Sequence, residues 1–174
     1  MLIALASLLL ALSIALTPWQ PQAPTPTLVV GSGIGPPGGT VSVPVRLDTA
    51  GIAARSYQVN LAYDGSTFPQ GLALRAGGTP DSWSFHQHSS GPGDLRALAF
   101  SFNPADFQPL VAGCNNGRCQ STYVAQLSIA PDAVACQSYP VTVALLDVRD
   151  ASNQLIPMSM THGAVWVTAP NGGC

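Results

Sequence analysis

Hydrophobic and polar side chains alternate strictly along two stretches of this chain, Val41–Leu47 and Tyr57–Asp64. A period of two is that of a β-strand that turns one face to a core and the other to water. The two stretches therefore predict two amphipathic strands. Pro44 lies within the first and predicts an edge position or a bulge, because proline has no N–H to donate to a β-ladder.

Further apolar segments are separated by turn-forming residues, and none after residue 16 has the period of an amphipathic helix. They predict additional short strands at Leu28–Val30, Gly71–Arg75, Trp83–His88, Leu95–Phe102, Tyr123–Ile129, Tyr139–Leu146 and Ala164–Thr168. Residues 31–39 are predicted to form a Gly/Pro loop. We therefore predict an all-β fold, a jelly-roll-like β-sandwich of about nine strands.

The alternation also predicts which side chains fill the space between the two sheets. Large apolar residues at alternate positions are assigned to the inner faces. The predicted inter-sheet core includes Leu47, Val59, Leu61, Leu98, Phe100, Leu127, Val143 and Val165.

The first sixteen residues are apolar apart from Ser7 and Ser13, and a proline-rich linker follows at 17–26. Residues 1–16 are predicted to be helical, with two interpretations. They are an export signal, with a small-x-small cleavage site at 13–15, or a retained helix that anchors in a membrane or packs in a filament. Membrane contact follows only if they are retained. Both interpretations predict a secreted or cell-surface protein, with the sandwich at 27–168 and a tail at 169–174.

Charged residues are scarce, at 8% of the chain with a net charge of −2. All six cations are Arg and all eight acids are Asp. Without a basic patch there is no electrostatic reason to expect nucleic acid. A weakly charged surface also repels its copies poorly, so self-association is an additional expectation.

Four cysteines agree with an oxidising compartment. Cys114 and Cys119 bracket the turn-forming tetrapeptide Asn-Asn-Gly-Arg, which predicts a local disulfide. Cys136 and Cys174 then pair with each other, or Cys174 stays free. We predict no zinc site, because no second tight cluster of Cys or His follows the first.

Motifs for catalysis and cofactors are not convincing. Residues 33–38 match G-x-G-x-x-G, but Pro36 and Pro37 lack amide hydrogens and a strand follows, so a turn is predicted. His86 and His88 point to the same side of one strand, yet no third ligand lies within sequence reach. Glu is absent and no G-x-S-x-G elbow occurs. We predict neither an enzyme nor a metal or other cofactor.

Trp83 and Phe85 alternate with serines along one predicted strand. One interpretation is an exposed aromatic platform for a sugar ring. The other is that both side chains face the core, and the alternation favours this second interpretation.

Several segments follow one another in an order that resembles a known family. Gly38-Gly-Thr40 leads into a strand, the next strand leaves through Tyr63-Asp64-Gly65, and Tyr139–Val143, Asp147–Ile156 and His162–Val167 complete the series. This order resembles a cohesin module, the β-sandwich that receives dockerins. The resemblance spans about Leu28 to Val167 and implies a binding or scaffolding function without catalysis.

The resemblance also implies a contact surface on the outward face of the strand before Tyr63. The matching positions here are Ser56, Gln58, Asn60 and Ala62, which are uncharged, so a neutral, hydrogen-bonding partner is expected. We therefore predict a non-catalytic extracellular module that binds a protein or polysaccharide. The alternative is a structural subunit of an extracellular filament or envelope layer with a retained N-terminal helix.

Overall fold

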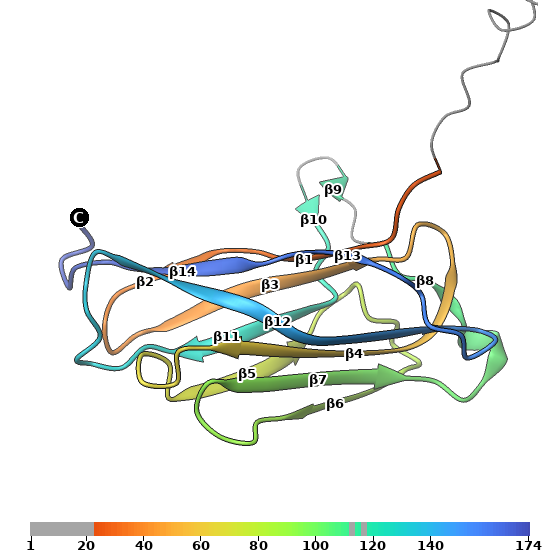
Figure 1. The fold of residues 1–174 in the computed structure, drawn as a ribbon, viewed down its shortest axis with the longest axis horizontal. Coiled ribbons are helices and arrows are strands. Elements are labelled where there is room, and N and C mark those ends of the chain that lie inside the picture. The colour runs from red at the N-terminus through yellow and green to blue at the C-terminus, as the bar shows by residue number, and fades with distance from the viewer. Residues whose placement is uncertain (1–22, 112–113, 116–117) are drawn as a thin grey trace, which may run out of the picture.

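Two β-sheets face one another in the computed structural model (Figure 1). The structure describes residues 23–111, 114–115 and 118–174, and the side chains of 112–119 are not among the described parts. The predicted N-terminal helix at 1–16 and most of the linker lie outside the described residues. No helix in the described part is long and apolar enough to cross a membrane.

The first sheet, sheet A, has five strands. Their spatial order is β13 (Ser159–Thr161), β1 (Thr27–Val30), β3 (Thr40–Asp48), β11 (Tyr123–Ser128) and β5 (Gln70–Arg75). The pairs are antiparallel except β1 with β13.

The second sheet, sheet B, has seven strands. Their order is β2 (Gly33–Gly35), β14 (Gly163–Val167), β12 (Gln137–Asp150), β4 (Ala53–Tyr63), β7 (Asp94–Phe100) and β6 (Ser84–His88), with β8 (Gln108–Pro109) paired beside the start of β4. A small hairpin, β9 (Cys114–Asn115) and β10 (Arg118–Cys119), stands off the body, and a 3₁₀ turn spans Pro104–Asp106. The predicted all-β sandwich is confirmed.

Pro44 is not on an edge strand, because β3 pairs with β1 on one side and β11 on the other. The prediction fails because β1 ends where proline would need to donate. β1 ends at Val30, which pairs with Val45 of β3. Gly31, just past β1, donates its N–H to the Pro44 carbonyl at 2.8 Å. A Cβ on Gly31 would lie 2.6 Å from the Pro44 ring, so glycine permits this close approach.

The chain crosses between the sheets at Gly31. Part of the predicted Gly/Pro loop, Gly33–Gly35, is in fact strand β2, which pairs in parallel with β14. The chain also passes from sheet A to sheet B between β13 and β14, where a Cβ on Gly163 would collide with the Gly31 carbonyl. Two glycines thus allow the crossing segments to touch.

Aromatic rings fill the centre of the sandwich and join the two sheets. Tyr57 of β4 stacks on Tyr123 of β11, with ring centroids 6.4 Å apart, and Trp83 lies 6.3 Å from Tyr57. Five of the predicted core residues are fully buried: Leu47, Val59, Leu61, Leu127 and Val165. Val143 is partly buried and packs against this core from its margin.

The prediction for β7 was wrong, because its faces are reversed. Leu98 and Phe100 point outward and are only partly buried, whereas Ala97 and Ala99 face inward and are 0% exposed. Ala99 pairs with Tyr57 of β4, and Ala97 pairs with Val59. The small side chains leave room for the larger neighbours, so local volume rather than hydrophobicity alone decides the face.

Candidate binding face

The side chains expected to contact a partner lie on the solvent side of sheet B. We call the solvent side of β12, β4, β7 and β6 the outer B face. Ser56, Gln58, Asn60 and Ala62 alternate along β4 with the fully buried Tyr57, Val59 and Leu61, so they point outward. Their role in binding stays a prediction.

The strand register arranges the outer B face in rows. Across β12, β4, β7 and β6 the aligned residues are Leu145, Asn60, Arg96 and His88; then Asp147, Gln58, Leu98 and His86; then Arg149, Ser56, Phe100 and Ser84. The Gln58 amide donates to Asn60 Oδ1 at 3.1 Å. Asn60 is only 8% exposed, so Gln58 is the more accessible of the two amides.

Aromatic side chains cover the β6–β7 end of this face. The His86 ring stacks on Phe100 with 5.7 Å between centroids, and Phe100 contacts Phe102 at 5.0 Å. Phe102 is 78% exposed. We call Leu98, Phe100, Phe102 and His86 the β7 strip. A contiguous apolar strip open to water is a feature of interaction surfaces.

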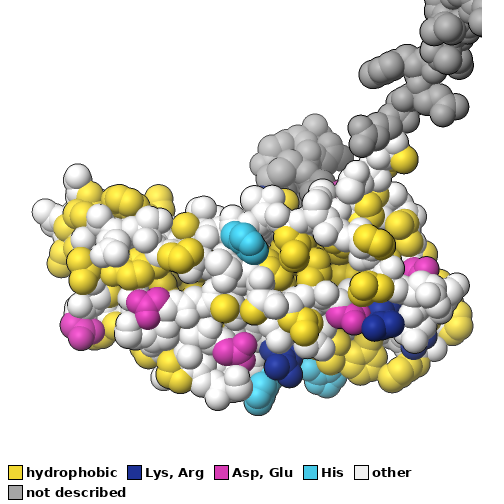
Figure 2. Space-filling view, viewed as in Figure 1, with side chains coloured by type: hydrophobic (Ala, Val, Ile, Leu, Met, Phe, Trp, Pro, Cys, Tyr) yellow, Lys and Arg dark blue, Asp and Glu magenta, His cyan; other side chains and the backbone are white. Residues whose placement is uncertain are grey.

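Charges on the outer B face are few, and two of them form an ion pair. Arg149 donates two hydrogen bonds to the Asp147 carboxylate, each 2.9 Å long. The Ser90 hydroxyl donates to Asp94 at the β6–β7 turn and holds the pKa of that carboxyl below its usual range. On β7, Arg96 lies in the row between that of Asp94 and that of Asp147. Figure 2, seen from the same direction as Figure 1, shows sparse charged side chains separated by hydrophobic and neutral polar ones.

Trp83 and Phe85 are not presented as a platform for sugars. Trp83 is 2% exposed, and its indole N–H donates to the Asp106 carbonyl at 3.0 Å. Phe85 is partly buried and packs against the core. Their alternation with serines therefore reflects the inner face of the sandwich.

The three histidines are dispersed over sheet B. His86 and His88 are both exposed on β6, and His86 is part of the β7 strip. His162 accepts a hydrogen bond from the Val143 N–H at 3.1 Å, beside an irregularity in β12. No group of three or more metal-ligating side chains occurs among the described residues.

Cys136 and Cys174 form a disulfide that ties the C-terminal tail to the start of β12. The sequence left open whether Cys174 pairs with Cys136 or stays free, and the structure shows the pair. Cys114 and Cys119 stand opposite one another in the β9–β10 backbone pairing. Their side chains lie outside the described residues, so the local disulfide stays a prediction.

The β7 strip was missed by sequence reasoning, although a signal for it exists. Arg96 has the same parity along β7 as Leu98 and Phe100, and it is exposed. A charged residue seldom shares a strand face with core residues. The position of Arg96 therefore indicates that this face meets water.

No family model and no curated protein matches the sequence. Solved structures do match. The cohesin CaCohA2 from Clostridium acetobutylicum is 25% identical, with a TM-score of 0.67, and the match covers 83% of this chain and 91% of the cohesin.

Two further cohesins are similar at lower sequence identity. The sixth cohesin of scaffoldin B from Acetivibrio cellulolyticus, solved with a mutant Cel5 dockerin, is 18% identical with a TM-score of 0.65, over 83% of this chain and 99% of that chain. A non-cellulosomal cohesin from Archaeoglobus fulgidus is 14% identical with a TM-score of 0.62, over 83% and 92%. This chain therefore has the fold of a cohesin module, as the sequence resemblance predicted.

Proposed function

We propose that this protein is a non-catalytic binding module that recognises a protein partner through the outer B face. The observation that carries the proposal is the β7 strip, which lies beside the uncharged Ser56 and Gln58 on β4. Apolar side chains supply binding energy by leaving water, and neighbouring amides supply directional hydrogen bonds. Similar folds have been solved as complexes with dockerins, which supports a protein as the partner.

We further propose that the module acts outside the cytosol, secreted or held at the cell surface. The Cys136–Cys174 disulfide supports this location, since such bonds persist in oxidising compartments. The proposed layout keeps residues 1–16 as a signal or anchor and 17–26 as a tether ahead of the sandwich.

The first prediction tests contact at Phe102. We replace Phe102 with the photo-crosslinking amino acid p-benzoylphenylalanine in cells that naturally make the protein. Its ring resembles phenylalanine, and the site is 78% exposed, so folding should be preserved. We expect a discrete adduct with one protein, measured by gel shift and mass spectrometry.

Two matched variants make the test specific. Met160 of β13 is 50% exposed on sheet A, and the same crosslinker placed there should give no such adduct. Adding Gln58→Arg to the crosslinker at 102 should lower the yield at least tenfold, because an arginine would disrupt the neutral part of the face. The proposal would be contradicted by equal adduct yields from positions 102 and 160, or by an adduct at 102 whose yield Gln58→Arg leaves unchanged.

A further inference from the structure

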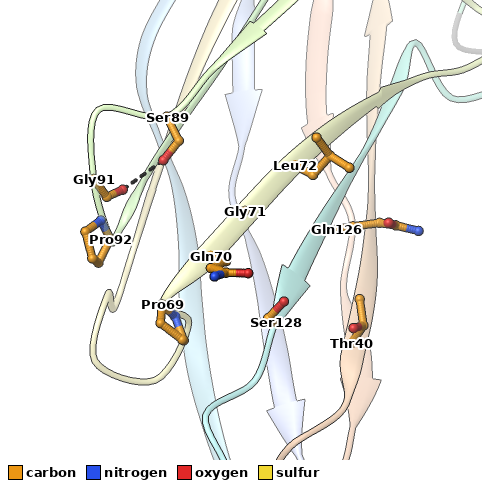
Figure 3. Close-up of a pocket in the computed structure, with 10 residues that line it drawn as sticks. All are labelled: Thr40, Pro69, Gln70, Gly71, Leu72, Ser89, Gly91, Pro92, Gln126 and Ser128. Carbon is orange, nitrogen blue, oxygen red and sulfur yellow. Dashed lines mark hydrogen bonds between the residues drawn. The ribbon is translucent and has the colours of Figure 1, made fainter.

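A groove opens on the side of the molecule opposite the outer B face. It runs from the solvent side of β3 and β11 across edge strand β5 to the β6–β7 loop (Figure 3). Its volume is about 550 Å³, within the usual range of small-molecule sites. The residues that line it are Thr40, Pro69, Gln70, Gly71, Leu72, Ser89, Gly91, Pro92, Gln126 and Ser128. We call it the sheet A groove.

Neutral polar side chains line up across the strands that form this groove. Gln70, Ser128 and Thr40 share one row through β5, β11 and β3. Gln126 pairs with Leu72 in the next row. None of these four polar side chains makes a hydrogen bond to another residue that the structure describes. Their amide and hydroxyl groups are therefore available as both donors and acceptors.

The groove has no ionisable lining residue. An anionic ligand would lose its hydration without finding a cation, and a cationic ligand would find no carboxylate. The apolar part of the lining comes from Leu72 and two prolines, Pro69 and Pro92. The groove thus combines apolar contact surface with unpaired, uncharged hydrogen-bonding groups.

We propose that the sheet A groove binds a segment of a neutral glycan. Sugar hydroxyls both donate and accept, which matches the amides of Gln70 and Gln126 and the hydroxyls of Thr40 and Ser128. The C–H faces of the sugar rings pack against Leu72 and the prolines. This site is separate from the aromatic pair Trp83 and Phe85, and its strand residues belong to sheet A, whereas the β7 strip lies on sheet B.

Calorimetric titration of the full chain tests the proposal. The probes are cellohexaose, xylohexaose and laminarihexaose, with hexagalacturonate as the anionic comparison. We expect at least one neutral hexasaccharide to bind and hexagalacturonate to bind at least tenfold more weakly. The double variant Gln70→Ala/Gln126→Ala should lower the affinity at least tenfold, because two amide partners are removed.

The matched control is Gln137→Ala/Gln154→Ala, which removes two exposed amides away from the groove. It should bind within twofold of the unchanged protein. In NMR spectra of the unchanged protein, the glycan should shift the amide signals of β5 and β11, a readout that needs no variant to fold. The proposal is overturned if no neutral hexasaccharide binds, if hexagalacturonate binds equally well, if both double variants lose affinity alike, or if the shifted signals lie on β4 and β7.

Discussion

Tyr57 and Tyr123 stack across the interior, yet their hydroxyl groups have different surroundings. The Tyr57 hydroxyl lies 2.7 Å from the Thr79 hydroxyl, which itself donates to the Thr122 carbonyl at 2.6 Å. The Tyr123 hydroxyl is buried without a hydrogen-bond partner among the described residues. Burial raises the pKa of both phenols, so both stay neutral in the folded protein.

This difference predicts opposite results for two matched substitutions. Tyr57→Phe should lower the free energy of unfolding by about 1 kcal/mol, because it removes a buried hydrogen bond and leaves Thr79 without its donor. Tyr123→Phe should cost nothing or stabilise the protein slightly, because it removes only an unsatisfied hydroxyl. Urea unfolding measures both. An equal loss for both variants would show that the Tyr123 hydroxyl has a partner, such as a buried water.

At the scale of single elements, the sequence predicted strands wherever a period of two ran for several residues. All nine predicted segments are strands, with shifts of a few residues at their ends. The two- and three-residue strands, such as β2 and β13, were not predicted, because a segment of that length is too short to show a period of two. The faces of β7 were misassigned because apolar alternation was given more weight than the outward position of Arg96, and the pattern does not include the volume of Tyr57 beside Ala99.

The reversed faces of β7 make a direct prediction about stability. Phe100→Ala should cost about 1 kcal/mol, the scale of a surface aromatic contact, rather than the 3–5 kcal/mol of a buried phenylalanine. Ala99→Leu should cost more, about 1–3 kcal/mol or above, because the added carbons must displace the Tyr57 ring. Urea unfolding of both variants compares them. A larger loss for Phe100→Ala than for Ala99→Leu would contradict the observed orientation.

For the whole molecule, the two candidate sites differ in how far the sequence reveals them. The outward side of β4 follows from one periodic strand and was predicted with its residues. The outer B face also needs β7 and β6, and the sheet A groove gathers residues from Thr40 to Ser128. No local pattern records which distant strands become neighbours, so only the fold reveals these surfaces.

The charge of the whole molecule predicts how binding responds to salt. The net charge is −2, and Arg149 on the outer B face is already paired with Asp147. Long-range attraction should therefore contribute little to association. Once the partner captured by the crosslinker at position 102 has been purified, biolayer interferometry measures its affinity for the unchanged module. We expect the dissociation constant to change less than threefold between 50 and 500 mM NaCl. Arg96 is the arginine of the outer B face that is not in the Arg149–Asp147 pair. The control variant Arg96→Gln should leave the salt response unchanged. A tenfold loss of affinity over that range, largely removed by Arg96→Gln, would mean instead that the partner is acidic and recognised through charge.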